Sequence, residues 1–367
     1  MRDLLDDLDR WRRESVKVAL ARVVDVAGSG PREPGAAMAV DERSQVVGSV
    51  SGGCVEGAVV AEGLEVLESG EGRLVSFGYS DDDAFAVGLT CGGTVHLFVE
   101  PLTAWPEGML DGLAAAIRAE QPVALATVIE GPGRGAKLLV RPGEPPLGSL
   151  GDPDLDRVVD RDTRGELAAG TTGVRHYGEH GEAREGAVAV FVETFAPPPQ
   201  MLIFGAVDFT GALVRVAKVL GYRVTVCDAR EVFATRSRFR QADDVVVDWP
   251  DRLLGRVGAS LTPRDAVCVL THDAKFDVPA LTAALATSAG YVGAMGSRRT
   301  HADRLARLRE AGVDEADLAR VRAPIGLDIG ARTPEETAVS ICAEIIADRT
   351  GRSEPLPLRR TDGPIHG

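Results

Sequence analysis

The sequence VALARVVDV at residues 18–26 is repeated, with few changes, as VALATVIE at residues 123–130. Both runs are rich in β-branched residues and predict β-strands. Four further landmarks follow in the same order in both halves of this region. They are GAAMAV at 35–40 and GAKLLV at 135–140, GSV at 48–50 and GSL at 148–150, VSFG at 75–78 and RHYG at 175–178, and GTVHLFVE at 93–100 and GAVAVFVE at 186–193. Five landmarks in one order predict an internal duplication.

The duplication predicts an N-terminal α+β domain over residues 1–196. This domain would hold two copies of one unit, at about residues 17–101 and 122–195, joined by an amphipathic segment at 110–117. Glycine and proline turns bound the expected strands of each copy.

The two copies differ at two loops. Copy one has SGGCVE at 51–56 and CGG at 91–93, where copy two has GDPD at 151–154 and REG at 184–186. Cysteines that only filled a core would be replaced by apolar residues. The replacements are polar turn residues, which indicates that both loops are exposed.

The first of these loops predicts a binding site. Gly52 and Gly53 precede a helix expected over residues 54–68, and its free N–H groups would face an anionic ligand. Cys54 at the positive end of the helix dipole favours a thiolate, which can bind a soft metal or carry sulfur. The alternative is a glycine turn with a small buried cysteine and Glu56 as a helix-capping carboxylate.

Cys91, Gly92 and Gly93 repeat the pattern of a cysteine beside paired glycines, so a functional site is favoured if the two loops meet. Upstream, residues 28–35 form a loop rich in glycine and proline, with Arg32 as its one cation. Arg32 is a candidate phosphate ligand, and a solvated arginine on a turn is the alternative.

Three prolines at 197–199 predict a stiff linker to a second domain over residues 200–350, followed by a tail at 351–367. Strands and helices alternate in this domain, which predicts a Rossmann-like doubly wound parallel sheet. The whole chain is therefore expected to be an α/β protein. The predicted strands are residues 201–206, 223–228, 244–249, 266–271 and 291–295, and the predicted helices include 210–220, 279–285, 298–309 and 338–348.

The glycine fingerprint of dinucleotide-binding domains is incomplete here. Gly205 ends the first strand and Asp228 ends the second, at the distance expected for a ribose-binding acid. However, Val207 and Thr210 stand at the second and third glycine positions, where a side chain obstructs a pyrophosphate. Binding of NAD(P) is therefore doubtful, although the Rossmann-like fold still predicts an NAD(P)-dependent oxidoreductase as the alternative function.

Other polar residues follow the predicted strands of this domain. His272 and Asp273 lie after the fourth strand and Ser297 and Arg298 after the fifth, where parallel sheets bind ligands. Ser297 and the arginines would bind an anion at a helix start, whereas Asp273, like Asp277, equally fits a helix cap. Two further predictions are structural: core packing for Cys227, Cys268 and Cys342, and a capping box at residues 333–336.

The composition excludes several classes of function. The chain of 367 residues has a net charge of −14, which disfavours binding to nucleic acid or to an anionic membrane surface. No apolar run approaches the length of a membrane span, and the start of the chain does not resemble a secretory signal. We expect a cytoplasmic protein with reduced cysteines, because the five cysteines show neither paired nor metal-binding spacing.

These motifs together resemble the XdhC/CoxI family over nearly the whole chain. The matching strings are GSGPREPG at 28–35, GGCVEG at 52–57, CGG at 91–93, LTHD at 270–273, YVG at 291–293, MGSRRT at 295–300, GLDIGA at 326–331 and TPEE at 333–336. The resemblance implies a protein that binds molybdenum cofactor and assists its sulfuration. It also implies insertion of the cofactor into a xanthine dehydrogenase-type or CO dehydrogenase-type molybdenum hydroxylase.

By this resemblance, Cys54 and Cys91 are the residues expected to contact the metal or sulfur of molybdenum cofactor (molybdopterin). The implied partners are the client hydroxylase and a cysteine desulfurase as sulfur donor. A homodimer is expected on a separate ground, because apolar duplicated units often pair. A carrier or chaperone is then expected rather than a turnover enzyme. Besides the oxidoreductase, a scaffold that docks a sulfurtransferase, with both cysteines merely structural, remains an alternative.

Overall fold

The structure is a computed structural model that describes residues 1–28, 32–78, 93–183, 186–352 and 354–361. The chain divides into two compact units. Unit 1 comprises residues 1–197 together with the C-terminal segment that begins at Leu358, and unit 2 comprises residues 198–357. Among the described residues, no helix is both long and apolar enough to cross a membrane.

Unit 1 contains two antiparallel five-stranded sheets of the same topology, which confirms the predicted duplication. Their strand orders are β3-β2-β1-β5-β4 and β8-β7-β6-β10-β9. The elements of the first half are α1 (Leu5–Arg13), β1 (Val18–Ala27), β2 (Ala37–Asp41), β3 (Val46–Gly48), α2 (Glu56–Ser69), β4 (Arg73–Phe77) and β5 (Thr94–Pro101). Those of the second are α3 (Met109–Arg118), β6 (Val123–Glu130), β7 (Lys137–Val140), β8 (Leu147–Ser149), α4 (Pro153–Ala169), β9 (Gly173–Tyr177) and β10 (Val188–Phe195).

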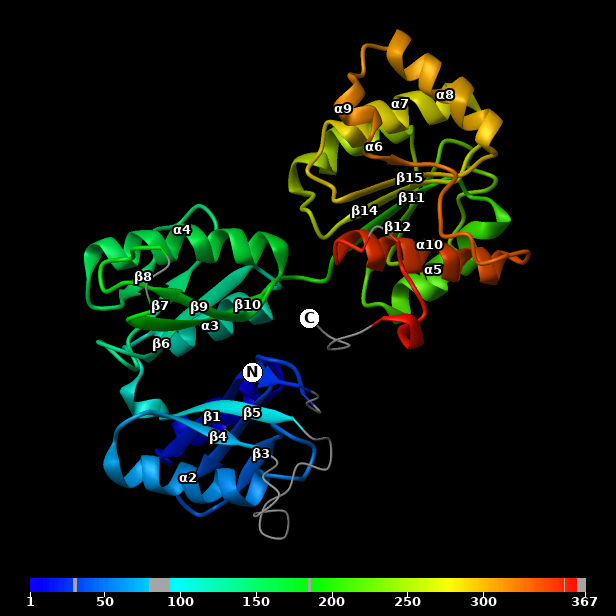
Figure 1. The fold of residues 1–367 in the computed structure, drawn as a ribbon. Coiled ribbons are helices and arrows are strands. Elements are labelled where there is room, and N and C mark those ends of the chain that lie inside the picture. Colours follow the sequence, from blue (N-terminus) through cyan, green and yellow to red (C-terminus); the bar gives the residue numbers. More distant parts are fainter. Residues whose placement is uncertain (29–31, 79–92, 184–185, 353, 362–367) are drawn as a thin grey trace. The chain divides into compact units, whose positions relative to one another are not determined.

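Alternation along the central strands creates separate apolar layers. On β1, Ala19 and Ala21 pack toward α2, while Val18 and Leu20 pack into a core shared with α1, α3 and the second sheet. The helices α2 and α4 thus each cover one face of their own sheet (Figure 1). The repeated unit also includes a leading helix, α1 or α3, so the helix expected as a linker at 110–117 belongs to the second copy.

The two copies meet through a buried ionic cluster. Arg22 Nη2 donates to Glu100 Oε1 at 2.8 Å and to Thr127 Oγ1 at 3.1 Å, and Arg22 Nη1 donates to Glu193 Oε2 at 3.4 Å. Lys137 Nζ donates to the other oxygen of Glu100. Because these charges are buried among apolar layers, their pairing is needed to offset the cost of removing them from water.

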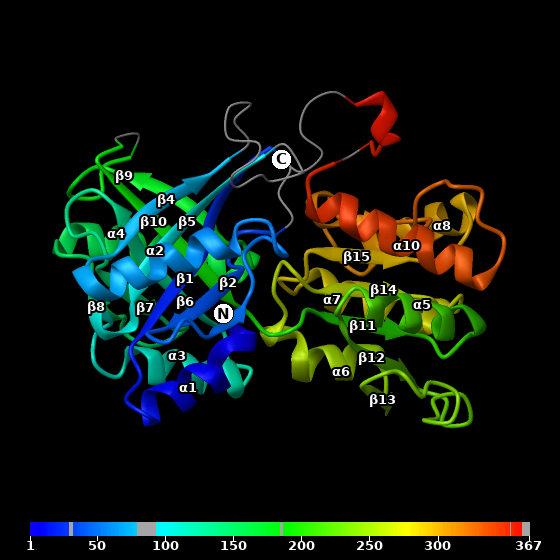
Figure 2. The same ribbon diagram turned by 90° about the horizontal axis from the view of Figure 1, so that it is seen from below.

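Unit 2 has a six-stranded sheet of order β13-β12-β11-β14-β15-β16, in which all pairs are parallel. This confirms the predicted doubly wound Rossmann-like sheet, and Figure 2 shows β13, β12, β11, β14 and β15 side by side. The strands are β11 (Gln200–Phe204), β12 (Arg223–Asp228), β13 (Asp244–Val247), β14 (Ala266–Val269), β15 (Tyr291–Ala294) and β16 (Val321–Arg322).

Helices cover both faces of this sheet. One core contains side chains from α5 (Asp208–Val219) and α10 (Pro334–Arg349), and the other contains side chains from α6 (Pro250–Val257), α7 (Ala274–Leu285), α8 (Arg298–Glu310) and α9 (Glu315–Leu318). Cys227, Cys268 and Cys342 are buried, which confirms their packing role. The capping box of Thr333 and Glu336 at the start of α10 is also confirmed.

Candidate functional site

The turn that carries Cys54 is held in place by Glu56. Glu56 accepts hydrogen bonds from the hydroxyls of Ser49 and Ser51 and from the N–H groups of Ser51, at 3.0 Å, and Gly53, at 2.8 Å. Burial by itself would raise the pKa of Glu56. These donors outweigh burial and lower the pKa to about 2. Glu56 is thus a fixed anion at the helix start that holds the preceding turn. No side chain among the described residues caps α2, which differs from the helix-capping alternative.

The remaining N–H groups of the turn are also bonded internally. Gly52 N–H donates to Ser49 Oγ at 2.9 Å, and Cys54 N–H donates to Ser51 Oγ at 3.0 Å. The glycine-loop N–H groups that were expected to bind an anion therefore already have intramolecular acceptors. A ligand at this turn would meet the thiol and the open surface of the loop first.

Helix α2 begins at Glu56, two residues later than predicted, so Cys54 lies before the helix and not in its first turn. Gly52 and Gly53 have φ values of +77° and +121°, which residues with a Cβ rarely adopt. A Cβ built at either glycine would meet nothing within 4 Å. These glycines therefore serve the turn conformation and leave open space beside a half-buried free thiol.

A cavity of about 340 Å³ lies next to this turn, because Ser49 belongs to both. Its lining residues include the exposed Arg32, the hydroxyls of Thr172 and Thr194, and the carboxyl group of Glu193. Burial raises the pKa of Glu193, while Arg22 Nη1 donates to its carboxyl group at 3.4 Å and opposes this shift. The cavity therefore offers the cationic groups of Arg2 and Arg32 and two threonine hydroxyls to an anionic ligand, alongside the carboxyl groups of Asp3 and Glu193.

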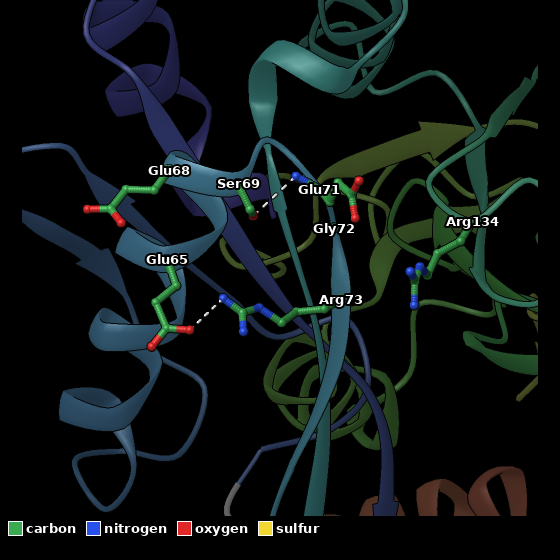
Figure 3. A pocket seen from close by; sticks show the side chains of 7 residues that line it. All are labelled: Glu65, Glu68, Ser69, Glu71, Gly72, Arg73 and Arg134. Atoms are coloured by element: carbon green, nitrogen blue, oxygen red, sulfur yellow. Dashed lines mark hydrogen bonds and ion pairs between the residues drawn. The ribbon is translucent and has the colours of Figure 1, made fainter.

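A second cavity, of about 600 Å³, lies at the equivalent place in the duplicated unit. Figure 3 shows Arg134 on one side and Gly72 and Arg73 on the other. Arg134 and Gly72 correspond to Pro34 and Thr172 of the first cavity, each 100 residues apart in the sequence.

This second cavity is less suited to an anion. Arg73 Nη2 donates to Glu65 Oε2 at 2.8 Å, as Figure 3 shows, so its charge is already paired. Glu68 and Glu71 add further negative charge. Of the two equivalent cavities, the one with Arg32 has the chemistry expected for a phosphate-bearing ligand.

The other sequence-predicted residues of unit 1 are only partly described. Gly93 is buried directly before β5, while Cys91 and Gly92 lie outside the described residues. In the part of the chain that the structure describes, no three His, Cys, Asp or Glu side chains are grouped as a metal site. Joint action of Cys54 and Cys91 thus stays a prediction.

In unit 2, Asp228 is fully engaged by neighbouring groups. It accepts from Ala206 N–H at 2.8 Å, from Arg230 N–H and Nε, both at 2.9 Å, and from Arg230 Nη2 at 2.7 Å. Burial opposes these bonds, but they lower the pKa of Asp228. An acid bonded in this way has little capacity to accept a ribose hydroxyl, which disfavours the oxidoreductase alternative.

Gly205 lies at the end of β11 with φ +112°, and a Cβ there would come within 2.8 Å of Thr271 Cγ2. Glycine is therefore needed at this position so that the end of β11 can pack closely against Thr271, which follows β14. Asp273 caps α7 by accepting from Lys275 N–H at 3.1 Å, as its structural alternative predicted, and His272 is exposed. Ser297 caps α8 by accepting from Thr300 N–H at 3.1 Å, and Arg298 is exposed beside it.

Sequence reasoning missed a buried group of three residues at the carboxyl edge of unit 2. Asp277, which the sequence offers both as a candidate site residue and as a helix cap, pairs with Arg304 at 2.8 Å and accepts from Thr271. Arg304 is one of several arginines in a basic helix, so only its spacing after the loop at 295–300 could have drawn attention to it.

Curated relatives match nearly the whole chain. A protein of Bacillus subtilis, named as a probable xanthine dehydrogenase subunit, is 26% identical over 344 residues, covering 93% of this chain and 96% of that protein. "Molybdenum cofactor insertion chaperone PaoD" of Escherichia coli is 28% identical over 335 residues, covering 91% of this chain and 84% of that protein.

A solved structure from Bacillus halodurans, described as a xanthine dehydrogenase, has the same fold. It superposes with a TM-score of 0.62 at 24% identity, over 96% of this chain and 98% of the other. The model of the XdhC and CoxI family matches residues 11–78 and 116–178, and the model of the XdhC Rossmann domain matches residues 201–345. With both of its domains matched in order, the chain belongs to the XdhC and CoxI family.

Proposed function

We propose that the chain binds molybdenum cofactor in unit 1 and inserts it into a client molybdenum enzyme. Membership of the family and the name of the Escherichia coli relative, an insertion chaperone, support this class of function. The observation that carries the proposal is the Cys54 turn, a half-buried free thiol beside open space and next to the Arg32 cavity.

The residues of this site fit the chemistry of the cofactor. A cysteine thiolate is a soft ligand suited to molybdenum or to its sulfur. Arg32, with five guanidinium donors, would bind the phosphate of the pterin part. Cys91 would be the second thiol, and Gly52, Gly53 and Glu56 would hold the turn that presents Cys54. A cavity of about 340 Å³ is of the size that small-molecule sites have.

The finer parts of the proposal concern partners. The client would be a hydroxylase of the xanthine dehydrogenase or CO dehydrogenase type, and a cysteine desulfurase would supply sulfur for cofactor sulfuration. A homodimer in the cytoplasm is the proposed working form. In this role the chain is a carrier and not a turnover enzyme.

The test is mass and metal analysis of the ligand retained by the full chain, purified from a molybdenum-replete host. We expect molybdenum and pterin in the wild type, and at least a roughly tenfold weaker retention after Cys54→Ala with Cys91→Ala. Asp154→Ala is the matched control, because Asp154 is the equivalent of Cys54 in copy two. Undiminished retention in the cysteine variant would exclude the thiols as ligands.

Arg32 is tested in the same assay against Arg134, which lines the equivalent cavity. We expect Arg32→Gln to weaken retention and Arg134→Gln to leave it unchanged. The opposite order would move the binding site to the second cavity.

A further inference from the structure

Near the carboxyl ends of the strands in unit 2, some polar side chains have all their hydrogen-bond partners and others lack them. At the end of β12, Asp228 is saturated by Ala206 and Arg230. Beside β15, two buried side-chain nitrogens find no partner among the described residues, namely Arg304 Nη1 and His301 Nδ1. Buried donors without acceptors are costly, so they indicate a place where another group binds.

Arg304 reaches the underside of the loop between β15 and α8. Its side chain is 3% exposed, and its Nη2 donates to Met295 O and to Asp277 Oδ2, both at 2.8 Å. A Cβ on Gly296, which has φ +147°, would lie 3.6 Å from Nη2 and 3.3 Å from Thr300 Cβ. Glycine at this position therefore lets the loop lie close against the guanidinium group, whose Nη1 has no partner among the described residues.

The same loop presents further donors. Ser297 caps α8, a helix of 13 residues, and the N–H groups of Arg298 and Arg299 lie in its first turn, where no intrahelical acceptor precedes them. Both arginine side chains are exposed. Because the positive end of the helix dipole adds to these charges, an anion at this loop is favoured.

Asp277 balances the charge of Arg304 but not the charges of Arg298 and Arg299. It pairs with Arg304 and accepts from Thr271, so the buried pair is neutral as a whole. The attraction for an anion must then come from the helix start, Arg298 and Arg299. Arg304 Nη1 is a further donor without a partner among the described residues.

We propose that the loop at residues 295–300 binds a phosphate group, either as free phosphate or as the terminal group of a phosphate monoester. The donors are the first N–H groups of α8, Arg298 and Arg304 Nη1. This site lies in unit 2 and does not depend on cofactor binding at Cys54. Since Asp228 is engaged by Arg230, the ligand would be held by its phosphate and not by a ribose diol.

The test is calorimetric titration of the full chain at low salt with inorganic phosphate and, separately, with adenosine 5′-monophosphate. We expect Arg298→Gln to weaken phosphate binding roughly tenfold, because a charge-assisted bond is lost. The matched control is Arg307→Gln, which removes an exposed arginine from the last turn of the same helix and should change nothing. The double change Arg304→Gln with Asp277→Asn removes the buried donor without leaving an unpaired charge, and should also weaken binding.

The two ligands distinguish the sources of the phosphate. Equal affinities support recognition of the phosphate group alone, and tighter binding of the monophosphate supports an organic phosphate ester. No heat from either ligand at millimolar concentration would overturn the proposal. Wild-type phosphate affinity in both the Arg298→Gln chain and the Arg304→Gln/Asp277→Asn chain would also overturn it. The Cys54→Ala chain should bind phosphate like the wild type, which separates this site from the one in unit 1.

Discussion

The two copies in unit 1 share a fold but start their long helices at different places. Helix α4 begins at Pro153, directly after Asp152, whose carboxylate accepts from Asp154 N–H at 2.9 Å and Leu155 N–H at 3.0 Å. Helix α2 begins at Glu56, although the residue equivalent to Pro153 is Gly53. Copy one therefore holds three residues outside the helix that copy two places inside it.

The difference has a local cause. Gly52 and Gly53 have positive φ values that are incompatible with a helix, whereas Pro153 is well suited to the first helical position. Both copies keep the same anchor behind the turn, since Glu56 accepts from Ser51 N–H and Asp156 accepts from Leu150 N–H. Gly52 and Gly53, in place of the equivalents of Asp152 and Pro153, thus account for the open turn, and Cys54, in place of the equivalent of Asp154, supplies its thiol.

The buried cluster between the copies shows a second asymmetry. Glu100 and Glu193 occupy equivalent positions, but the cations do not, because Arg22 corresponds to Thr127 and Lys137 corresponds to Ala37. Each copy supplies one cation from a different strand. We infer that this arrangement fixes one pairing of the two copies, since a shifted pairing would leave buried charges unpaired.

The largest expected effect comes from breaking this cluster at one of its two equivalent carboxylates. Glu100→Gln removes the acceptor shared by Arg22, Lys137 and Trp105, and should lower the free energy of unfolding by about 3–5 kcal/mol. Glu193→Gln should cost about 1 kcal/mol, because within the cluster Glu193 accepts one long hydrogen bond, from Arg22 at 3.4 Å, whereas Glu100 accepts from three groups. Urea unfolding of both variants measures the difference, and equal losses would contradict it.

The second prediction replaces the residues before α2 with those that begin α4. We expect a small change in stability and a large loss of cofactor binding. Gly52→Asp with Gly53→Pro should extend α2 toward Cys54 and preserve the fold, because Asp152 and Pro153 do the same in α4. Retention of molybdenum cofactor should fall at least roughly tenfold. Circular dichroism and metal analysis are the measurements, and full retention with an extended helix would show that the open turn is unnecessary.

The smallest expected effect concerns the anchor behind the turn. Glu56→Gln should destabilise the chain by about 1 kcal/mol, and Asp156→Asn in copy two by a similar amount, because each removes a charged acceptor of N–H groups in the turn before the helix. Thermal unfolding measures both. If only one of the two variants loses stability, the carboxylate anchors of the two copies do not contribute equally.

The lowered pKa of Glu56 also gives this contribution a pH dependence. With a folded-state pKa of about 2, below the usual value of 4.5, the ionised Glu56 stabilises the fold at pH above about 4.5. The contribution is lost as the pH falls from 4.5 toward 2. The difference in stability between wild type and Glu56→Gln should therefore shrink over this range.

Much of the fold could be predicted from the sequence because the relevant signals are local. The prediction of a strand at residues 223–228 is confirmed by β12, which has those bounds, since a β-branched run bounded by turns suffices. The duplication was visible because its strands and turn glycines keep the same order. The leading helices α1 and α3 were not recognised as part of the repeat, because their shared feature is only an apolar face.

The candidate sites could be predicted less completely. The sequence singled out Cys54, Arg32 and Ser297, but it placed Cys54 inside the helix and left Glu56 open between a ligand and a cap. The saturation of Asp228 by Arg230 and the pairing of Asp277 with Arg304 were not foreseen. Each depends on side-chain directions at the ends of strands, which local sequence patterns do not specify.

The sequence by itself determined the order of the elements, the duplication and the identity of the reactive groups. These follow from backbone preferences and apolar periodicity, which act over a few residues. Only the tertiary structure decided which of the described donors are already satisfied and which remain free. Packing brought Glu56 onto the glycine turn and left Arg304 with an unused donor. Burial removes the water that would otherwise satisfy each polar group, so the partners of a buried group depend on the side chains packed around it.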